Sequence, residues 1–218
     1  FSVIHEAGHA IYELGIRDDL TLTPVGQGAS MGMHESQSRF FENIIGRSRS
    51  FWEPVYARVQ EMFPEQLGKA DLDQFVEAVN KVTPGLIRTE ADELSYSLHV
   101  LIRYEIEKML IEEDLDVEKL PQLWADWSQG SFGYFPSYAL GSAFGAQLYY
   151  HMKEIMDFDG LLKEGKVDVI RDYLREHIHQ YGKLKDSRRI LKDVTGEDFN
   201  PEYYVRYLKE KYSGIYGL

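Results

Sequence analysis

Two histidines and a glutamate near the start of the chain have the spacing of a metal site. They lie in the segment His5-Glu6-Ala7-Gly8-His9. Residues four apart share one face of a helix, so both imidazoles can bind one divalent cation. Glu6 would then lie beside the cation, where its carboxylate can accept a proton from an activated water. The flanking residues are small and apolar, whereas two solvated histidines would predict polar neighbours.

A catalytic zinc needs a third protein ligand and one open position. Tyr12 and Gly15 stand where the metzincin pattern has Gly and His, so that class is excluded. Glu35 is the candidate, because Pro and Gly in residues 23–30 favour a loop, after which an antiparallel helix would bring Glu35 back. His34 is a rival ligand, but adjacent helical residues point about 100° apart, so both are not expected to bind. Spacing alone favours an ordinary surface carboxylate at Glu35.

The hydrophobic residues recur mostly with the period of a helix, so we expect helices to position these residues. The only strand-like alternation, Leu20 to Thr23, predicts at most a brief edge strand. Without a repeat or a long linker, we expect one mostly helical unit. The predicted helices cover Ser2 to Leu14, Met33 to about Gly46, Phe51 to Met62, Leu72 to Val82, Pro84 to about Glu113, Ser137 to about Met156, Val167 to Tyr181, Arg188 to Val194 and Asn200 to about Tyr212.

Composition narrows the class of protein. The 218 residues are 44% hydrophobic and 28% charged, which is ordinary for a globular chain that buries a core. No apolar run approaches the roughly 20 residues that span a membrane. A formal charge of −12 argues against a nucleic-acid surface. The absence of cysteine excludes disulfides and thiolate ligands, and fits a cytoplasmic enzyme.

Three further positions could bind a substrate. Arg88 carries a guanidinium that pairs with a carboxylate in bidentate fashion, although a surface salt bridge with Asp92 is the simpler interpretation. Tyr134 and Tyr138 lie in a turn marked by Gly and Pro, where a phenol could donate a hydrogen bond to a developing oxyanion. Packing in an aromatic core is the alternative for both tyrosines.

Other candidates share predicted helix faces. His99 and Arg103 are four apart on the long helix and could face the same cleft as Arg88, or could simply be buried. Glu42 follows Glu35 by seven residues on nearly the same face, and could accept the second N–H of a metal-binding histidine. Pairing with Arg39 or Arg49 explains Glu42 equally well. The remaining histidines are interpreted as surface or packing residues: His151, His177 and His179.

Taken together, the motifs resemble the thermostable carboxypeptidase Taq family of metallopeptidases. Three of the family's motifs are intact, and further matching stretches follow in residues 42–48 and 130–141. The resemblance implies that Glu35 is the third metal ligand and that Arg88 belongs to the substrate pocket. The intact motifs are His5-Glu6-Ala7-Gly8-His9, His34-Glu35-Ser36-Gln37 and Ile87-Arg88-Thr89-Glu90-Ala91-Asp92.

The chain also departs from this family. Its members are considerably longer, and their HPF and D-x-R-x-T motifs, which lie upstream, are absent here. Of the family's G-x-x-Q-D-x-H-W motif only Trp127 survives, which indicates a deletion or an omitted stretch at about Asp126/Trp127. We therefore expect residues 1–218 to be a single helical catalytic portion without the upstream part of the family fold.

These patterns predict an all-α, zincin-like metallopeptidase body with at most a minor β element. His5, His9 and Glu35 would hold one divalent metal, zinc in the first instance, with cobalt or manganese as alternatives. The expected reaction is hydrolysis of the C-terminal peptide bond of a peptide with a free C-terminus, with Glu6 as the base. Alternatives are an endopeptidase or aminopeptidase with the same core, and an impaired metal-binding fragment or helical interaction domain. The resemblance also suggests a homodimer.

Overall fold

The computed structural model describes residues 1–83, 85, 87–112, 118 and 136–218, and these residues form helices and turns without any strand. The prediction of an all-α fold is therefore confirmed. The elements are α1 (Ser2–Leu14), η1 (Asp18–Leu20), α2 (Met31–Arg39), η2 (Phe40–Ile45), α3 (Arg49–Trp52), α4 (Tyr56–Met62), α5 (Pro64–Leu67), α6 (Leu72–Val79), η3 (Arg88–Glu90), α7 (Glu93–Glu112), α9 (Pro136–Ile155), α10 (Phe158–Lys163), α11 (Val167–His177), η6 (His179–Leu184), α12 (Ser187–Thr195) and α13 (Glu202–Tyr216).

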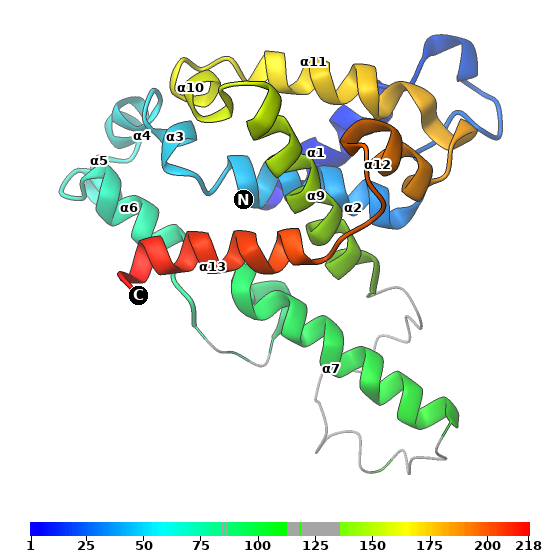
Figure 1. Cartoon of the computed structure of the whole chain (residues 1–218). Coiled ribbons are helices and arrows are strands. Elements are labelled where there is room, and N and C mark those ends of the chain that lie inside the picture. Colours follow the sequence, from blue (N-terminus) through cyan, green and yellow to red (C-terminus); the bar gives the residue numbers. More distant parts are fainter. Residues whose placement is uncertain (84, 86, 113–117, 119–135) are drawn as a thin grey trace.

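Helix α9 lies at the centre of the described part of the molecule and contacts α2, α13, α7 and α12 (Figure 1). Its middle, residues 141–150, is a run of mostly small and apolar residues that are buried or nearly so. Apolar side chains from α9, α11 and α12 form the main core and exclude water from it. Its most deeply buried members include Leu148, Met152, Ile170, Leu174, Ile190 and Leu191.

Two glycines let α2 lie unusually close to its neighbours. A Cβ built on Gly8 of α1 would come within 2.7 Å of Ser38 Cα, and one on Gly141 of α9 within 2.5 Å of Glu35 Cβ. A larger side chain at either position would force the backbone of α2 to move. Both α1 and α9 therefore contact α2 through a glycine. The turn of α2 that contains Glu35 and Ser38 is therefore clamped between α1 and α9.

The second predicted helix is present but changes its winding. After Arg39 the chain widens into the π-helix η2, where the N–H of Gly46 bonds the carbonyl of Phe41 five residues back at 2.8 Å. Ser30 caps the start of α2 by accepting a hydrogen bond from the Met33 N–H at 3.1 Å. The widened turn alters the direction in which Glu42 leaves the helix.

The brief edge strand that Leu20 to Thr23 could at most have formed is not present. Leu20 ends the 3₁₀-helix η1, and the Thr23 hydroxyl donates to the Leu20 carbonyl at 2.6 Å. Leu22 has a positive φ of 63° and is fully exposed, which no extended strand would allow. Alternation of Leu and Thr is too short a pattern to outweigh these local hydrogen bonds.

The start of the long helix also differs from the prediction. Pro84, the predicted first residue, lies outside the described residues, and α7 begins only at Glu93. Asp92 determines this start, since its carboxylate accepts hydrogen bonds from the N–H of Ser95 at 2.8 Å and from its hydroxyl at 2.8 Å. Arg88 therefore lies in the short η3 turn before the helix, not inside it.

Smaller differences occur elsewhere. The helix predicted over Phe51 to Met62 is interrupted around Pro54, because proline lacks the N–H that would continue α3 into α4. The last helix begins close to the predicted position but continues to Tyr216, where Gly217 takes a positive φ of 67° and ends it. None of the described helices has both the length and the apolar character needed to cross a membrane.

The glycine clamp makes a stability prediction. Gly8→Ala should lower the free energy of unfolding by roughly 1–3 kcal/mol, because the added methyl group must displace α2 backbone. Gly214→Ala in α13 is the matched control, since a Cβ there meets nothing within 4 Å. The control should be neutral or stabilising by about 0.5–1 kcal/mol. Urea unfolding followed by circular dichroism measures both, and equal effects would contradict the close packing of α1 on α2.

Candidate metal centre

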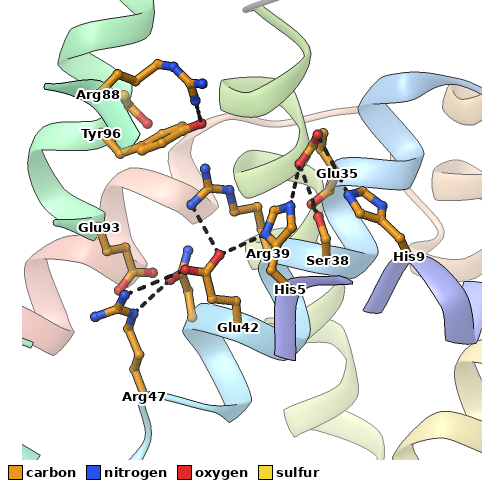
Figure 2. Close-up of polar contacts among 12 residues, drawn as sticks. His5, His9, Glu35, Ser38, Arg39, Glu42, Arg47, Arg88, Glu93 and Tyr96 are labelled. Atoms are coloured by element: carbon orange, nitrogen blue, oxygen red, sulfur yellow. Dashed lines mark hydrogen bonds and ion pairs between the residues drawn. The ribbon is translucent and has the colours of Figure 1, made fainter. Parts of the chain in front are cut away.

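Helix α1 presents His5 and His9 one turn apart, with their rings edge to face and their centroids 4.9 Å apart. Both Nε2 atoms face the carboxylate of Glu35 on α2 (Figure 2). The Nε2 of His5 lies 3.6 Å from Glu35 Oε2, and the Nε2 of His9 lies 3.9 Å from Glu35 Oε1. The predicted return of the second helix thus brings all three side chains together.

The three side chains fit a divalent cation. One donor atom from each lies within 4.8 Å of the other two. Bonds of 2.0–2.1 Å in a tetrahedral site separate ligand atoms by roughly 3.3 Å, so the two carboxylate–imidazole distances need to shorten only slightly. Two imidazole nitrogens and one carboxylate form a donor set that suits zinc and several neighbouring metals.

Burial of Glu35 strengthens this fit. The side chain is only 2% exposed, and its Oε2 accepts a hydrogen bond from the Ser38 hydroxyl at 3.1 Å. Burial raises the pKa of Glu35, although the neighbouring His5 and Arg39 oppose that effect. Burial also lowers the pKa of His9 to about 4, helped by the nearby rings of His5 and His34. A cation stabilises a buried carboxylate that faces two imidazole nitrogens.

Glu42 lies behind His5, on the side away from Glu35. Its Oε2 lies 2.9 Å from His5 Nδ1 and 3.4 Å from a guanidinium nitrogen of Arg39, and its Oε1 lies 3.6 Å from Arg47. Burial opposes ionisation of Glu42, but the hydrogen bond from His5 and the charge of Arg39 lower its pKa to about 2. Glu42 therefore makes two of the contacts considered from the sequence, to His5 and to Arg39.

The other sequence candidates for partners of this centre lie elsewhere. Arg49 bonds Asp73 at 2.8 Å and Glu53 at 3.0 Å instead of Glu42. His34, the rival ligand, lies on the far side of His9, with 2.8 Å between their Nδ1 atoms.

An open cleft of about 450 Å³ lies beside His5. Glu6 borders it, next to the histidine, and Arg88 and Tyr138 border it from the opposite elements. The Arg88 guanidinium bonds the Tyr96 hydroxyl and lies 5.1 Å from the centroid of the Tyr138 ring. The proposed base and the proposed carboxylate-binding residue therefore share one cleft.

His99 and Arg103 are not part of the described lining of this cleft. Both are on α7, where they are 8% and 3% exposed, and neither is among the described residues that line the cavity. The expectation that they face the same cleft as Arg88 stays a prediction, since both follow the cleft residue Tyr96 on α7. Tyr134 and the Asp126/Trp127 junction lie outside the described residues.

Two residues that line the cleft were not assigned to it from the sequence. Arg39 follows Glu35 by one helical turn and stacks on Tyr96, with its guanidinium carbon 3.7 Å from the ring centroid. The four-residue spacing from Glu35 was a usable signal for Arg39. Nothing local indicated Tyr96, because its position depends on how α7 packs against α2 and α9.

Packing roles fit the histidines outside the centre. His179 is fully buried and its Nε2 lies 2.8 Å from the side-chain oxygen of Gln37. The ring also packs against Tyr12, with 5.2 Å between centroids. His151 Nε2 lies 3.0 Å from the Tyr173 hydroxyl, and His177 stacks on the same tyrosine.

Comparison with known proteins identifies the family. The chain matches the model described as Carboxypeptidase Taq (M32) metallopeptidase over residues 1–126 and 125–212. This chain belongs to the M32 metallopeptidase family. The two matched pieces meet where the sequence indicated an interruption of the family pattern. Membership implies a divalent metal, and His5, His9 and Glu35 form a possible site for it.

Relatives agree with this assignment along the whole chain. Carboxypeptidase 1 of Bacillus subtilis is 46% identical over 100% of this chain and 48% of its own length. Thermostable carboxypeptidase 1 of Pyrococcus furiosus is 40% identical over 97% of the chain and 47% of its own. The crystal structure of the M32 carboxypeptidase from Deinococcus radiodurans superposes with a TM-score of 0.94 at 33% identity, covering 100% of this chain and 48% of that one. The chain thus spans about half the length of these relatives.

His179 makes the stability of the metal-free protein depend on pH. Burial lowers its pKa from 6.5 to about 3, so only the unfolded chain gains a proton as the pH falls through 6.5. Stability should therefore decrease below pH 6.5, by at most about 1.4 kcal/mol per pH unit from this residue. His179→Gln should reduce that slope, as measured by urea unfolding between pH 7 and 4.5. Identical slopes for the two proteins would refute this role.

Proposed function

We propose that this chain forms the catalytic portion of a metal-dependent carboxypeptidase. The observation that carries the proposal is the convergence of the His5 and His9 Nε2 atoms on the buried Glu35 carboxylate, beside a cleft that Glu6 borders. Family membership supports a metallopeptidase, and the matched relatives are named carboxypeptidases. Zinc is the proposed metal, because two imidazoles and one carboxylate are a common catalytic zinc set.

The protein side of the mechanism follows from these positions. A divalent cation bound there would act as a Lewis acid and lower the pKa of a coordinated water to near neutrality. Glu6 accepts the proton from the attacking water and later delivers it to the leaving amine. To Tyr138, which borders the same cleft, we assign a hydrogen bond from its phenol to the developing oxyanion. Glu42 keeps the His5 ring oriented through its Nδ1 contact.

Selection of a C-terminus is assigned to Arg88. Its guanidinium borders the cleft that also contains Glu6, and a guanidinium can bind a carboxylate with two parallel hydrogen bonds. Tyr96 orients it, since the phenolic hydroxyl is the acceptor for one of its N–H groups. A peptide would thus lie with its terminal carboxylate at Arg88 and its last peptide bond towards the histidines.

Assembly and location remain part of the proposal. The family resemblance supports a homodimer and the absence of cysteine fits the cytoplasm. The chain spans about half the length of its relatives, so activity should be measured on the whole protein that contains it. An impaired metal-binding portion would bind the cation and cleave no peptide.

Glu6→Gln separates chemistry from metal binding. The variant should keep its metal, as measured by elemental analysis, because the side chain is not one of the three proposed ligands. Hydrolysis of a reporter peptide should fall by a factor on the order of 10²–10⁴, the usual contribution of a general base. Glu77→Gln, an exposed change on α6, is the matched control and should retain full activity. Normal turnover by Glu6→Gln, or loss of its metal, would exclude the assigned role.

Arg88 can be tested with paired substrates. The protein should hydrolyse a peptide with a free C-terminus and reject the same peptide as its C-terminal amide. Arg88→Gln should raise KM for the free acid roughly 10- to 100-fold, since a charge-assisted contact contributes about 1.5–3 kcal/mol.

Arg49→Gln, which removes an exposed ion pair, is the matched control and should leave KM unchanged. Equal cleavage of acid and amide would instead identify an endopeptidase, and loss of cleavage on N-terminal acetylation would identify an aminopeptidase.

A further inference from the structure

The two histidines of the candidate centre are held from behind in different ways. His5 Nδ1 lies against a carboxylate, that of Glu42. His9 Nδ1 instead lies 2.8 Å from Nδ1 of a third imidazole, His34. The other nitrogen of His34, Nε2, lies 2.6 Å from Oε1 of Glu13. A chain of three side chains therefore runs from the proposed ligand to an acid on the same helix.

We propose that His34 and Glu13 are positioning residues that fix the tautomer and orientation of His9 for metal binding. The inference rests on the proposed function of His9 as a ligand. It assigns a role to His34, which the sequence left as a rival ligand, and to Glu13, which no motif indicated.

With both imidazoles neutral and Glu13 ionised, one arrangement of protons satisfies the whole chain. In that arrangement the His9 Nδ1–H donates to His34 Nδ1, and the His34 Nε2–H donates to the Glu13 carboxylate. The Nε2 of His9 then carries a free lone pair, directed to the side where Glu35 lies. This is the tautomer that a metal ligand needs.

The opposite arrangement is unfavourable for a clear reason. If His34 donated from Nδ1 to His9, its neutral ring would present an Nε2 lone pair to a carboxylate oxygen 2.6 Å away. The His9 Nε2 would then carry a hydrogen and could not bind a cation. The negative charge of Glu13 therefore selects the competent form of a ring that it does not touch.

The surroundings hold the chain in place. Glu13 Oε1 also accepts the N–H of Gly28 at 2.9 Å, which fixes the carboxylate against the loop before α2. The Tyr12 ring packs on His34 with 4.9 Å between centroids, and its hydroxyl accepts the N–H of Ala29 at 2.9 Å. A Cβ on Gly28 would come within 2.6 Å of the His34 ring, so the loop closes directly over it.

Adjacent residues of α2 thereby perform two tasks. Glu35 faces both imidazoles at their Nε2 atoms, whereas His34, about 100° further round the helix, reaches the back of His9. Glu13 lies one helical turn after His9 on α1. The same face of α1 therefore carries both the proposed ligand and the carboxylate at the other end of the hydrogen-bonded chain.

Two variants test this chain of His9, His34 and Glu13 without deleting a proposed ligand. His34→Leu removes the acceptor for His9 and keeps much of the volume. Glu13→Gln keeps the shape and the contact with Gly28, but its amide can donate to His34 and so permits the other tautomer. His177→Leu and Glu77→Gln are the matched controls, since both residues lie outside the proposed centre.

The first measurement is zinc affinity by competition with a chromogenic chelator. We expect the dissociation constant to rise roughly 10- to 100-fold for His34→Leu and by about tenfold for Glu13→Gln, as for other residues that orient a metal-binding histidine. The two controls should bind as the unaltered protein does. Urea unfolding of each metal-free variant identifies any loss of affinity that comes from loss of fold.

The second measurement needs no metal. Two-dimensional ¹⁵N–¹H spectra of the histidine rings in the metal-free protein should show His9 protonated at Nδ1, with a shift towards protonation at Nε2 in Glu13→Gln. Unaltered zinc affinity in folded His34→Leu, or protonation of His9 at Nε2 in the unaltered protein, would overturn the proposal. Failure of the unaltered protein to bind zinc at all, with His9 still protonated at Nδ1, would instead refute the proposed function.

Discussion

The buried carboxylate of Glu35, held where three helices meet, is the constraint on which the rest of the centre depends. Gly8 and Gly141 let α1 and α9 press on the same turn of α2, so this carboxylate cannot move away from the two imidazoles. Removal from water raises its pKa, and the neighbouring positive groups only partly offset that cost. A divalent cation between the carboxylate and the rings would supply the missing charge. The same helix packing would therefore hold this carboxylate in place for metal binding.

Each imidazole of the centre also has a polar partner at its other nitrogen, Nδ1. Glu42 stays ionised because His5 and Arg39 hold its pKa at about 2 against the effect of burial, so it can keep accepting a hydrogen bond from His5. Glu42 makes this contact from the π-helix η2, into which the chain widens after Arg39. His9 depends on an imidazole in place of a carboxylate, which adds no negative charge directly behind the second ring.

Sequence patterns predicted the parts of this structure that are local. The helix with His5 and His9 follows from spacing alone, and the all-α fold follows from periodicity. The return of Glu35 needed the family resemblance, because it depends on how a loop closes. The predicted start of α7 is wrong because the sequence pattern places it at Pro84. The residue that caps the helix is Asp92, whose carboxylate accepts the N–H of Ser95. Contacts such as Arg39 on Tyr96 join distant elements, so no local pattern could reveal them.

The start of α7 borders the side of the cleft on which Arg88 lies. Glu93, the first residue of α7, is buried and pairs with Lys211 of α13 at 2.5 Å, where burial lowers the lysine pKa and the carboxylate opposes that shift. Breaking one partner of such a pair would leave an uncompensated buried charge, so this end of α7 is firmly anchored. One turn later Tyr96 receives a hydrogen bond from Arg88 and stacks under Arg39. The ion pair between α7 and α13 thus helps to hold the turn of α7 that carries Tyr96, the partner of the proposed carboxylate-binding residue.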